Sequence, residues 1–555
     1  MEDDARRRQG AFFTPPAWAA EAHKQLASSL GSSWQDQYFV WDPAAGTGNL
    51  THSVNLPNLM SSTLEPSDVG MMKDRGCKGI LFQYDFLNPG ASNLPPVAED
   101  ALRAAARQGK RLLFFMNPPY GAGSAGMGEA SRAGMTRTLV ADQMRGFGLG
   151  KAAGQLFCQF VFQADVLAKR YGFENYVVAF FSATTFLTSI SFAPFREFWY
   201  SKFNYRDGFV FQASAFSGVS GAWAICFTVW EAGGSTPPIG SGPTLRILEQ
   251  GPEGEIRTVG RKCFFAPTSS TSASNWARPL ASPKNKVSLP ALTSGLRVKP
   301  GETKSVPENF LAYLVNNSNA MYDSASMCTW GSLPMTPSGF AVLPENWRRA
   351  VALFAARKLV GVTWWTGKDE YCAPQESSPG YEQWVDDCHA YVLLHHTNCT
   401  AAMRSRPDAL RVSNPWFWRT RSSLRTLSSN LVGDLLADME AEPPCLKIQE
   451  APFGEPYFAH LLAQGKVRLS SDAAAVLGLL DNCWLQSLPL RSDFDQHRRA
   501  TGEQDLHLAA WDAGTYQLRH LFRKHFPNAW AEVLAAHGAL ARRLADGVYH
   551  YGFLV

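Results

Sequence analysis

The sequence has no long apolar run, no paired cysteines and little net charge, and each absence narrows the class of protein. Its 555 residues contain no stretch of about 18 or more apolar residues, so we expect no membrane-spanning helix. The opening MEDDARRRQG is charged and no apolar core follows it, which is unlike a secretory signal. The ten cysteines include no CxxC pair, a pattern typical of free thiols in a cytosolic protein.

The charge balance leaves nucleic acid open as a partner, and the missing motifs argue against a nuclease domain. With 52 Lys and Arg against 48 Asp and Glu, the net charge is +4, which is too small to decide for or against nucleic acid. A local basic groove remains compatible with this balance. The sequence shows no Pro-Asp…Glu-x-Lys arrangement and no His-rich nuclease motif, so we expect no nuclease domain.

Short apolar runs in the first 235 residues predict the buried strands of an α/β domain. These runs lie at 38–43, 62–66, 79–86, 111–119, 176–186 and 222–230. Helix-like stretches accompany them, among them 16–30 and 156–172. Alternation of strands and helices favours a mainly parallel, doubly wound sheet.

Two loop-like segments rich in Gly, Pro, Ser and Thr, at 232–244 and 266–286, divide the chain. A hairpin is expected between them at 245–259. After the second segment the alternation fades, and from residue 456 helical patterns dominate. We therefore expect an α/β domain, a mixed α+β domain and a mainly helical C-terminal region, at 1–265, 287–445 and 446–555.

The strongest motif is VWDPAAGTGNL at 40–50, in which an apolar strand ends at Asp42 and a glycine-rich turn follows. At the carboxyl edge of a parallel sheet, Gly46 and Gly48 let the backbone approach a nucleotide-like ligand closely. The turn is not GxGxxG and lacks the lysine of a P-loop, so we do not expect a triphosphate. A purely structural glycine turn is the alternative.

Two more acidic residues follow the next predicted strands. Glu65 ends the second strand, where a carboxylate can accept hydrogen bonds from both ribose hydroxyls. Asp85 ends the third strand and is followed by Phe86, which suits an adenine amino group beside an apolar ring. A lone acidic residue at a strand end is usually a cap, but three in order after three strands favour a binding site.

The second motif is Asn117-Pro118-Pro119-Tyr120, directly after the apolar strand RLLFFM. Proline cannot continue a central ladder and has a fixed φ, so these residues form a stiff loop. The loop holds an amide oxygen, a free backbone carbonyl and an aromatic face together. That combination suits a planar, amine-bearing group stacked on Tyr120, and a mere strand-ending turn is the alternative.

In their order, FFTPP (12–16), DPAAGTGN (42–49), LEP (64–66), YDF (84–86) and NPPYG (117–121) resemble the S-adenosylmethionine-dependent N6-adenine methyltransferases of DNA, in particular their gamma class. In that class the cofactor motifs precede the catalytic motif, and the target-recognition domain comes last. The resemblance implies a Rossmann-like methyltransferase sheet in a catalytic domain at 1–265. It also implies a target-recognition domain at 287–445, a DNA-binding function completed by 446–555, and duplex DNA as the partner.

The resemblance implies roles for single residues. It assigns S-adenosylmethionine to Phe13, Thr14, Pro15, Asp42, Gly46, Gly48, Asn49, Glu65, Asp85 and Phe86. It assigns catalysis to Asn117, Pro118, Pro119 and Tyr120. Tyr120 and Phe216 would hold the flipped base, with Phe209 and Phe211 as rivals of Phe216 and core packing as the alternative for all three phenylalanines.

The implied reaction is direct methyl transfer to N6 of a flipped adenine, by a modification-only protein of a bacterium or phage, with or without a separate restriction or defence partner. Three alternatives stay open. They are an RNA adenine methyltransferase, a protein glutamine methyltransferase, and a catalytically silent DNA-binding or anti-restriction protein of the same fold. The large rear region favours a duplex-DNA reader over the first two, and the intact motifs disfavour the third.

Three further segments give weaker indications of function. The Gly-rich stretch at 121–150 predicts a mobile loop whose Arg132, Arg137 and Arg145 either meet phosphates or are solvated. The segment 414–425 is either a DNA contact or a packed aromatic turn. The third signal is a cluster of cysteines and histidines at Cys372, Cys388, His389, His395, His396 and Cys399. Its spacing matches no familiar zinc site, so we assign no metal.

Overall fold

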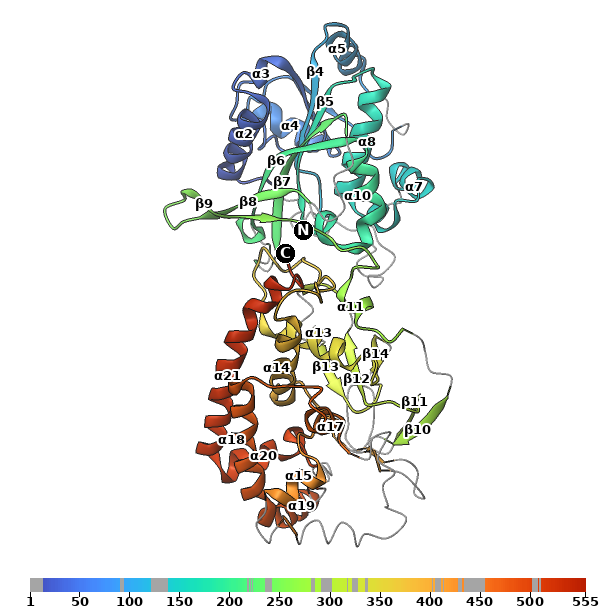
Figure 1. Cartoon of the computed structure of the whole chain (residues 1–555). Helices are drawn as coiled ribbons and strands as arrows, with labels where there is room; N and C mark the ends of the chain where they lie inside the picture. The colour runs from blue at the N-terminus through green and yellow to red at the C-terminus, as the bar shows by residue number, and fades with distance from the viewer. Residues whose placement is uncertain are drawn as a thin grey trace. The chain divides into compact units, whose positions relative to one another are not determined.

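The computed structural model describes residues 13–89, 94–120, 138–216, 219, 221, 223–234, 242–280, 285–290, 302–316, 318–321, 328–334, 338–401, 403–404, 411–412, 414–427, 432–433, 455–501, 508 and 511–555. The chain divides into two compact units (Figure 1). Unit 1 comprises Met1–Thr268, Val362–Glu370 and Val555, and unit 2 comprises Ser269–Gly361 and Tyr371–Leu554. The chain therefore returns to unit 1 at 362–370 after it has entered unit 2.

Unit 1 is built on a nine-stranded sheet of order β3-β2-β1-β4-β5-β7-β6-β8-β9. The strands are β1 (Tyr38–Asp42), β2 (Leu59–Thr63), β3 (Ile80–Gln83), β4 (Arg111–Met116), β5 (Tyr176–Ala183), β6 (Phe203–Gln212), β7 (Ala224–Ala232), β8 (Thr244–Gln250) and β9 (Ile256–Cys263). Strands β1 to β5 pair in parallel, whereas β7 is antiparallel to β5 and β6. The doubly wound, Rossmann-like sheet predicted from the sequence is confirmed.

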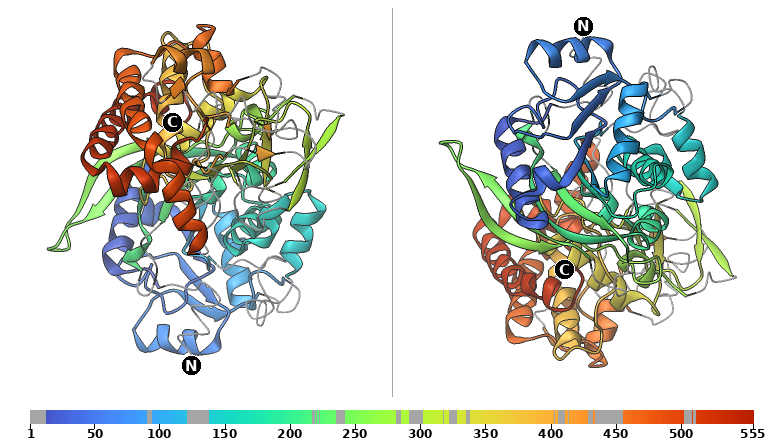
Figure 2. Two further views of the ribbon diagram at one scale, coloured as in Figure 1. Left: turned by 90° about the horizontal axis from the view of Figure 1, so that it is seen from below. Right: turned by 90° about the horizontal axis from the view of Figure 1, so that it is seen from above.

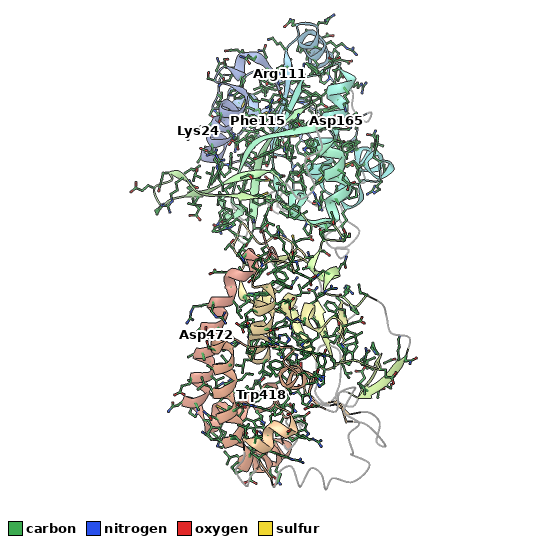
Figure 3. All side chains as sticks on the ribbon, in the orientation of Figure 1. Lys24, Arg111, Phe115, Asp165, Trp418 and Asp472 are labelled. Atoms are coloured by element: carbon green, nitrogen blue, oxygen red, sulfur yellow. The ribbon has the colours of Figure 1, made fainter. Side chains whose placement is uncertain are left out.

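Helices cover both faces of this sheet because its strands are apolar on both sides. In β1, Phe39 and Trp41 belong to one core, whereas Tyr38 and Val40 belong to the other. The first face is covered by α5 (Pro96–Arg107), α7 (Leu139–Gly146), α8 (Leu156–Arg170) and α10 (Ala193–Tyr200), and the second by α2 (Pro16–Leu30). In Figure 3, Lys24 of α2 and Asp165 of α8 lie on opposite sides of the strand residue Phe115.

Shorter elements complete unit 1. They are α3 (Trp34–Gln37), α4 (Pro66–Asp74), η1 (Gly150–Gly154), α9 (Thr185–Thr188), η2 (Ile190–Phe192) and η3 (Ala213–Ala215). The hairpin expected at 245–259 is confirmed as β8 and β9, which join the sheet where β8 pairs in parallel with β6. This hairpin extends beyond the helices of its unit in Figures 1 and 2.

Two strand ends differ from the sequence prediction. Strand β2 ends at Thr63, so Glu65 is not a strand residue but the N-cap of α4, which Pro66 begins because its fixed φ suits the first helical position. Strand β3 ends at Gln83, so Asp85 lies in the loop that follows. Both carboxylates are therefore carried by backbone that has already left the sheet.

Strand β6 was not predicted, because its sequence does not alternate cleanly. Arg206 and Asp207 interrupt the apolar pattern, and the pairing with β7 shifts register between Tyr205 and Asp207. Such a bulge places an extra residue in one strand and hides the period of two. The apolar end, Phe209 to Phe211, is nevertheless fully buried.

The loop predicted at 121–150 is in part helical. Residues 121–137, with Arg132 and Arg137, lie outside the described part of the chain. Helix α7 follows because the Thr138 hydroxyl accepts a hydrogen bond from the Ala141 N–H (3.0 Å), a regular N-cap. Arg145 lies on this helix and forms an ion pair with Asp142 (2.6 Å), so it is not a loop residue.

Unit 2 combines small antiparallel sheets with helices, which confirms the expected mixed α+β part and mainly helical end. Its strands are β10 (Lys286–Pro290), β11 (Thr303–Pro307), β12 (Ala312–Asn316), β13 (Cys328–Gly331), β14 (Gly339–Val342), β15 (Met403–Arg404) and β16 (Arg411–Val412). Its helices are α11 (Ala273–Trp276), α13 (Trp347–Leu359), α14 (Tyr381–Leu394), α15 (Arg421–Thr426), α17 (Tyr457–Ala463), α18 (Ser471–Ser487), η6 (Leu488–Leu490), α19 (Arg491–Ala500), α20 (Thr515–His525) and α21 (Pro527–His550).

Helix α14 forms the centre of unit 2. Every residue from Trp384 to Leu394 is buried, and the helix packs against α13, α18 and α21. Its two buried carboxylates are neutralised from neighbouring helices, Asp386 by Arg348 (2.6 Å) and Asp387 by Arg543 (2.6 Å). The larger hydrophobic core of this unit has members from Ala273 to Leu554 and includes both strands and helices. A smaller core lies at β10, β11 and β12, with Leu289, Val306 and Tyr313 among its members.

The weaker signals of the rear region lie mostly in this interior. At 414–425 the structure has a packed aromatic turn, in which Trp416, Phe417 and Trp418 are buried (Figure 3 labels Trp418). His389 is fully buried and uses both ring nitrogens, toward Trp347 Nε1 (2.9 Å) and the Val385 carbonyl (2.8 Å). Over the described ranges we find no group of three or more His, Cys, Asp or Glu side chains suited to a metal, and no helix long and apolar enough to span a membrane.

Candidate functional site

The two sequence motifs begin at neighbouring strand ends. Strands β1 and β4 are adjacent and parallel, so their carboxyl ends meet at one edge of the sheet. β1 ends at Asp42, and β4 ends at Met116, immediately before Asn117. Glu65 and Asp85 follow the ends of β2 and β3 at the same edge. The edge therefore gathers the polar residues expected to bind a ligand, as in other doubly wound sheets.

Asp42 is a buried acid with one unsatisfied oxygen. Its side chain is 1% exposed, and its Oδ1 accepts a hydrogen bond from the Ala44 N–H (3.1 Å). Among the described residues, Oδ2 has no hydrogen-bond partner. Burial raises the pKa of this carboxyl to about 8. A buried acceptor without a donor is costly, which points to a ligand that supplies one.

The glycine motif forms a series of turns rather than a helix. Gly48 has φ +82°, where other residues are strained, and a Cβ there would lie 2.8 Å from Cys77 Sγ, so a side chain would also have to displace Cys77. Gly46 has φ +50°, and the ring of Phe13 lies against it, 3.3 Å from the position of a Cβ. Gly48 thus serves the packing of the turn, while Gly46 allows Phe13, which is 44% exposed, to lie over it.

Arg75, at the end of α4, braces this turn. Its Nη1 donates to the Thr47 carbonyl (2.9 Å) and to Asn49 Oδ1 (2.5 Å). Asn49 Nδ2 in turn donates to the Thr14 carbonyl (3.4 Å). Asn49, predicted to bind the cofactor, therefore links the turn to the segment before α2. Sequence reasoning missed Arg75, since no local motif marks it.

The catalytic motif is tied to the same segment. Asn117 Nδ2 donates to the Thr14 hydroxyl (2.9 Å), and Asn117 Oδ1 accepts from the Tyr120 hydroxyl (2.7 Å). Thr14 is only 3% exposed and precedes Pro15, which caps α2. Both ends of the Asn117 amide are thus held, on a loop stiffened by Pro118 and Pro119.

Tyr120 meets two aromatic side chains edge to face. Its ring lies 6.4 Å from Phe216 and 6.2 Å from Trp223, at nearly right angles to both. Phe216 is 1% exposed and stacks on Phe211 (5.8 Å), so the predicted second aromatic is mainly a core residue in this structure. Its rivals Phe209 and Phe211 are fully buried in β6. The half-buried Trp223 was missed, because a tryptophan at the start of an apolar strand gives no separate signal.

The remaining residues predicted to bind the cofactor differ in whether their side chains are exposed to a ligand. The Glu65 side chain is exposed and makes no capping hydrogen bond to α4. Asp85 is engaged locally, because Oδ1 accepts from the Leu87 and Asn88 N–H groups (both 3.1 Å). Phe86 is 2% exposed and stacks on Phe160 (5.1 Å) in the core. These assignments stay predictions, and Glu65 is the residue most open to a ligand.

Comparisons with known proteins give matches among solved structures. No protein-family model and no curated protein matches the chain. Among solved structures, it is similar to a DrdV–DNA complex (18% identity, 44% of this chain and 28% of that chain, TM-score 0.31). It is also similar to the Type IIL restriction-modification enzyme MmeI in complex with DNA (13%, 52% and 45%, 0.31). A third is the M protein of the Type I restriction enzyme EcoKI (11%, 49% and 59%, 0.26).

The chain spans less than two thirds of each of these proteins. Its activity, substrate and partners are therefore inferred from the site itself.

Proposed function

We propose that the chain is an S-adenosylmethionine-dependent methyltransferase that acts on N6 of an adenine flipped out of duplex DNA. The observation that carries this proposal is the position of Asn117. Its amide stands on a Pro-Pro loop at the end of β4, next to the strand that ends at the buried Asp42. The motifs at 42–49 and 117–121 resemble those of the N6-adenine methyltransferases of DNA, which supports adenine as the target base and DNA as the substrate.

The residues of the sheet edge fit the cofactor. The unpartnered Oδ2 of Asp42 suits a buried ammonium group, and the exposed carboxylate of Glu65 suits two ribose hydroxyls. Phe13 lies over Gly46, where it would cover a bound ligand. When bound, S-adenosylmethionine supplies an electrophilic methyl group on a sulfonium.

The role of the NPPY loop follows from its hydrogen-bonding groups. An adenine N6 amine is a weak nucleophile, because its lone pair is delocalised into the ring. The Asn117 Oδ1 and the Pro118 carbonyl would accept its two hydrogens and so favour a pyramidal nitrogen. A carboxamide oxygen has two lone pairs, so Oδ1 can accept an amine hydrogen beside the bond from Tyr120. The protein contributes position and electrostatics rather than a strong base.

Tyr120 supplies the surface for the base. Taking a base out of the duplex costs a few kcal/mol. Stacking of the flipped base on an aromatic ring stabilises it by about 1–3 kcal/mol, which offsets much of that cost. Edge contacts from Phe216 and Trp223 hold the Tyr120 ring in place before a base arrives.

The proposal is tested with the purified full chain and S-adenosylmethionine labelled in its methyl group. The label is offered to unmethylated duplex DNA, RNA and protein, and the products are digested and identified by mass spectrometry. We expect N6-methyladenine in DNA, with the DNA left uncut. N6-methyladenine only in RNA, or methylglutamine in protein, would favour those alternatives, and no transfer would favour the silent protein.

A further inference from the structure

We propose that His23 is a positioning residue for the cofactor, which fastens helix α2 to the glycine turn at 46–50 and so keeps Phe13 over that turn. This inference rests on the proposed function. His23 lies in the middle of α2 and belongs to no sequence motif. A buried hydrogen bond nevertheless joins it to Leu50, the last residue of the turn.

The hydrogen bond between His23 and Leu50 has only one possible direction. His23 Nε2 lies 2.8 Å from the Leu50 carbonyl oxygen, and a carbonyl oxygen can only accept. The proton of the imidazole is therefore on Nε2. Burial lowers the pKa of His23, so the ring is neutral at pH 7 and Nδ1 carries no proton. A ring with its proton on Nδ1 would turn the lone pair of Nε2 toward the carbonyl oxygen, so that tautomer is excluded.

The surroundings of His23 hold its ring in one place and keep it dry. The residue is 9% exposed and belongs to the buried face of α2. Its ring stacks on Trp34 (5.9 Å) and meets Phe115, labelled in Figure 3, edge to face (5.2 Å). Both neighbours are fully buried. Because water does not compete at such a position, the bond to Leu50 is firm, and its loss would deprive a buried carbonyl of a donor.

Two adjacent residues of the turn are hydrogen-bonded to the segment that contains α2. Asn49 Nδ2 donates to the Thr14 carbonyl, just before the helix, over a long distance of 3.4 Å. Leu50 accepts from His23, inside the helix, at 2.8 Å. Hydrogen bonds between nitrogen and oxygen are strongest near 2.9 Å, so the His23 bond is the stronger of these two links.

The position of α2 determines where Phe13 lies. Pro15 is the N-cap of α2 and has φ −62°, so the residues just before it leave the helix along a stiff path. The ring of Phe13 lies against Gly46, 3.3 Å from the position of a Cβ there. A helix that moved away from the turn would carry this ring with it. His23 thus keeps the turn and its cover, both proposed to bind the cofactor, at a fixed spacing.

A histidine with a purely structural role would stabilise the fold without affecting the cofactor, and two variants separate these roles. His23→Phe keeps a ring and removes the donor, whereas His23→Gln keeps an N–H donor near the place of Nε2. His537→Phe is the matched control, because His537 Nε2 also donates to a backbone carbonyl, that of Tyr391 (2.9 Å), and its ring stacks on Tyr391, but in unit 2.

Three quantities are measured for each full-length variant. Calorimetry gives the affinity for S-adenosylmethionine without DNA, and thermal unfolding gives the melting temperature. Methyl transfer to unmethylated duplex DNA is followed at saturating S-adenosylmethionine. The first quantity reports on the positioning role, the second on a structural role, and the third on the chemical step.

We expect His23→Phe to raise the dissociation constant for S-adenosylmethionine by about three- to tenfold, because a loosened turn spends only part of its time in the binding form. At saturating cofactor the transfer rate should stay close to wild type, as for a residue that acts on binding alone. His23→Gln should recover most of the affinity. His537→Phe should lower the melting temperature and bind the cofactor as wild type does. Should His23→Phe not fold, His23→Asn is too short to reach Leu50, and the same loss is expected.

The outcomes separate the two proposals. A wild-type chain that binds no S-adenosylmethionine overturns the proposed function and the role of His23 with it. A chain that binds the cofactor but methylates no DNA overturns the proposed substrate alone. Unchanged cofactor affinity in His23→Phe, with an active wild type, overturns the positioning role alone. That role also fails if His23→Gln binds as weakly as His23→Phe, or if His537→Phe loses as much affinity.

Discussion

Asn117 and Thr14 are hydrogen-bonded across 103 positions of the chain, with Asn117 Nδ2 donating to the Thr14 hydroxyl at 2.9 Å. This bond joins the loop after β4 to the segment before α2. The same segment covers the glycine turn through Phe13 and bonds to it through Asn49. The residues proposed for the base and those proposed for the cofactor are thus parts of one connected network.

Asn117→Ala should reduce methyl transfer to a small fraction of the wild-type rate, since it removes the oxygen that accepts an amine hydrogen. Loss of one such preorganised group typically costs about 10²–10³ in rate. Cofactor affinity should be largely kept, because Asp42 and Glu65 are untouched, and calorimetry can check this. Asn58→Ala is the control: Asn58 bonds to Lys110 (2.6 Å) beside the amino end of β2, away from the site. Equal methylation by wild type and Asn117→Ala would remove Asn117 from the mechanism.

Tyr120 should act through its ring more than through its hydroxyl. Tyr120→Phe keeps the aromatic face and loses one hydrogen bond, worth about 0.5–1.5 kcal/mol. Tyr120→Leu loses the stacking surface as well, worth about 1–3 kcal/mol per base. We therefore expect a small decrease in kcat/KM for DNA with Tyr120→Phe and a much larger one with Tyr120→Leu. Equal losses in both variants would show that the hydroxyl is the essential group.

Asp42 should make the protein less stable as the pH rises. Its pKa is raised by burial from 3.8 to about 8, so in the folded chain it keeps a proton that the unfolded chain releases above about pH 4. The Asp42 contribution to the free energy of unfolding therefore falls between about pH 4 and pH 8 and levels off above that range. Asp42→Asn, which cannot ionise, should show a flatter decline in melting temperature. Identical pH profiles would mean that Asp42 is ionised when buried.

Cofactor binding should release the Asp42 proton. An ammonium group beside Oδ2 favours the ionised carboxylate, so affinity for S-adenosylmethionine should rise between about pH 6 and pH 8. Calorimetry at pH 7 in two buffers of different ionisation enthalpy detects such a proton directly. The measured heat should depend on the buffer for wild type and not for Asp42→Asn. A buffer-independent heat for wild type would contradict the ion pair.

Arg75→Ala should weaken cofactor binding although Arg75 belongs to no motif. It removes the hydrogen bonds that hold Thr47 and Asn49 in the glycine turn. At about 0.5–1.5 kcal/mol for such a bond, the dissociation constant should rise by about three- to tenfold. Arg103→Ala is the matched control, because Arg103 forms an exposed i,i+4 pair with Glu99. An unchanged affinity in Arg75→Ala would show that the turn holds its shape without this brace.

The strands nearest the site were predictable because their signals are local. The apolar run before Asp42, and the one before Asn117, each end where a charge or a proline makes further pairing unfavourable. Helix α2 occupies 16–30, the range predicted for it, because Pro16 begins it and a regular apolar stripe follows. Strand β6 was missed for the opposite reason, since its bulge breaks the pattern that identifies a strand.

The sequence by itself determined the doubly wound sheet and placed Asp42, Glu65 and Asn117 at its carboxyl edge. Apolar periodicity and proline affect only the few residues around them, so they predict strands and strand ends without knowledge of the tertiary structure. Only the tertiary structure decided that Arg75 braces the turn, that the Asp85 carboxylate is engaged in its own loop, and that Thr14 meets Asn117. Those contacts depend on where packed elements bring distant side chains together, and no local pattern encodes the distance between them.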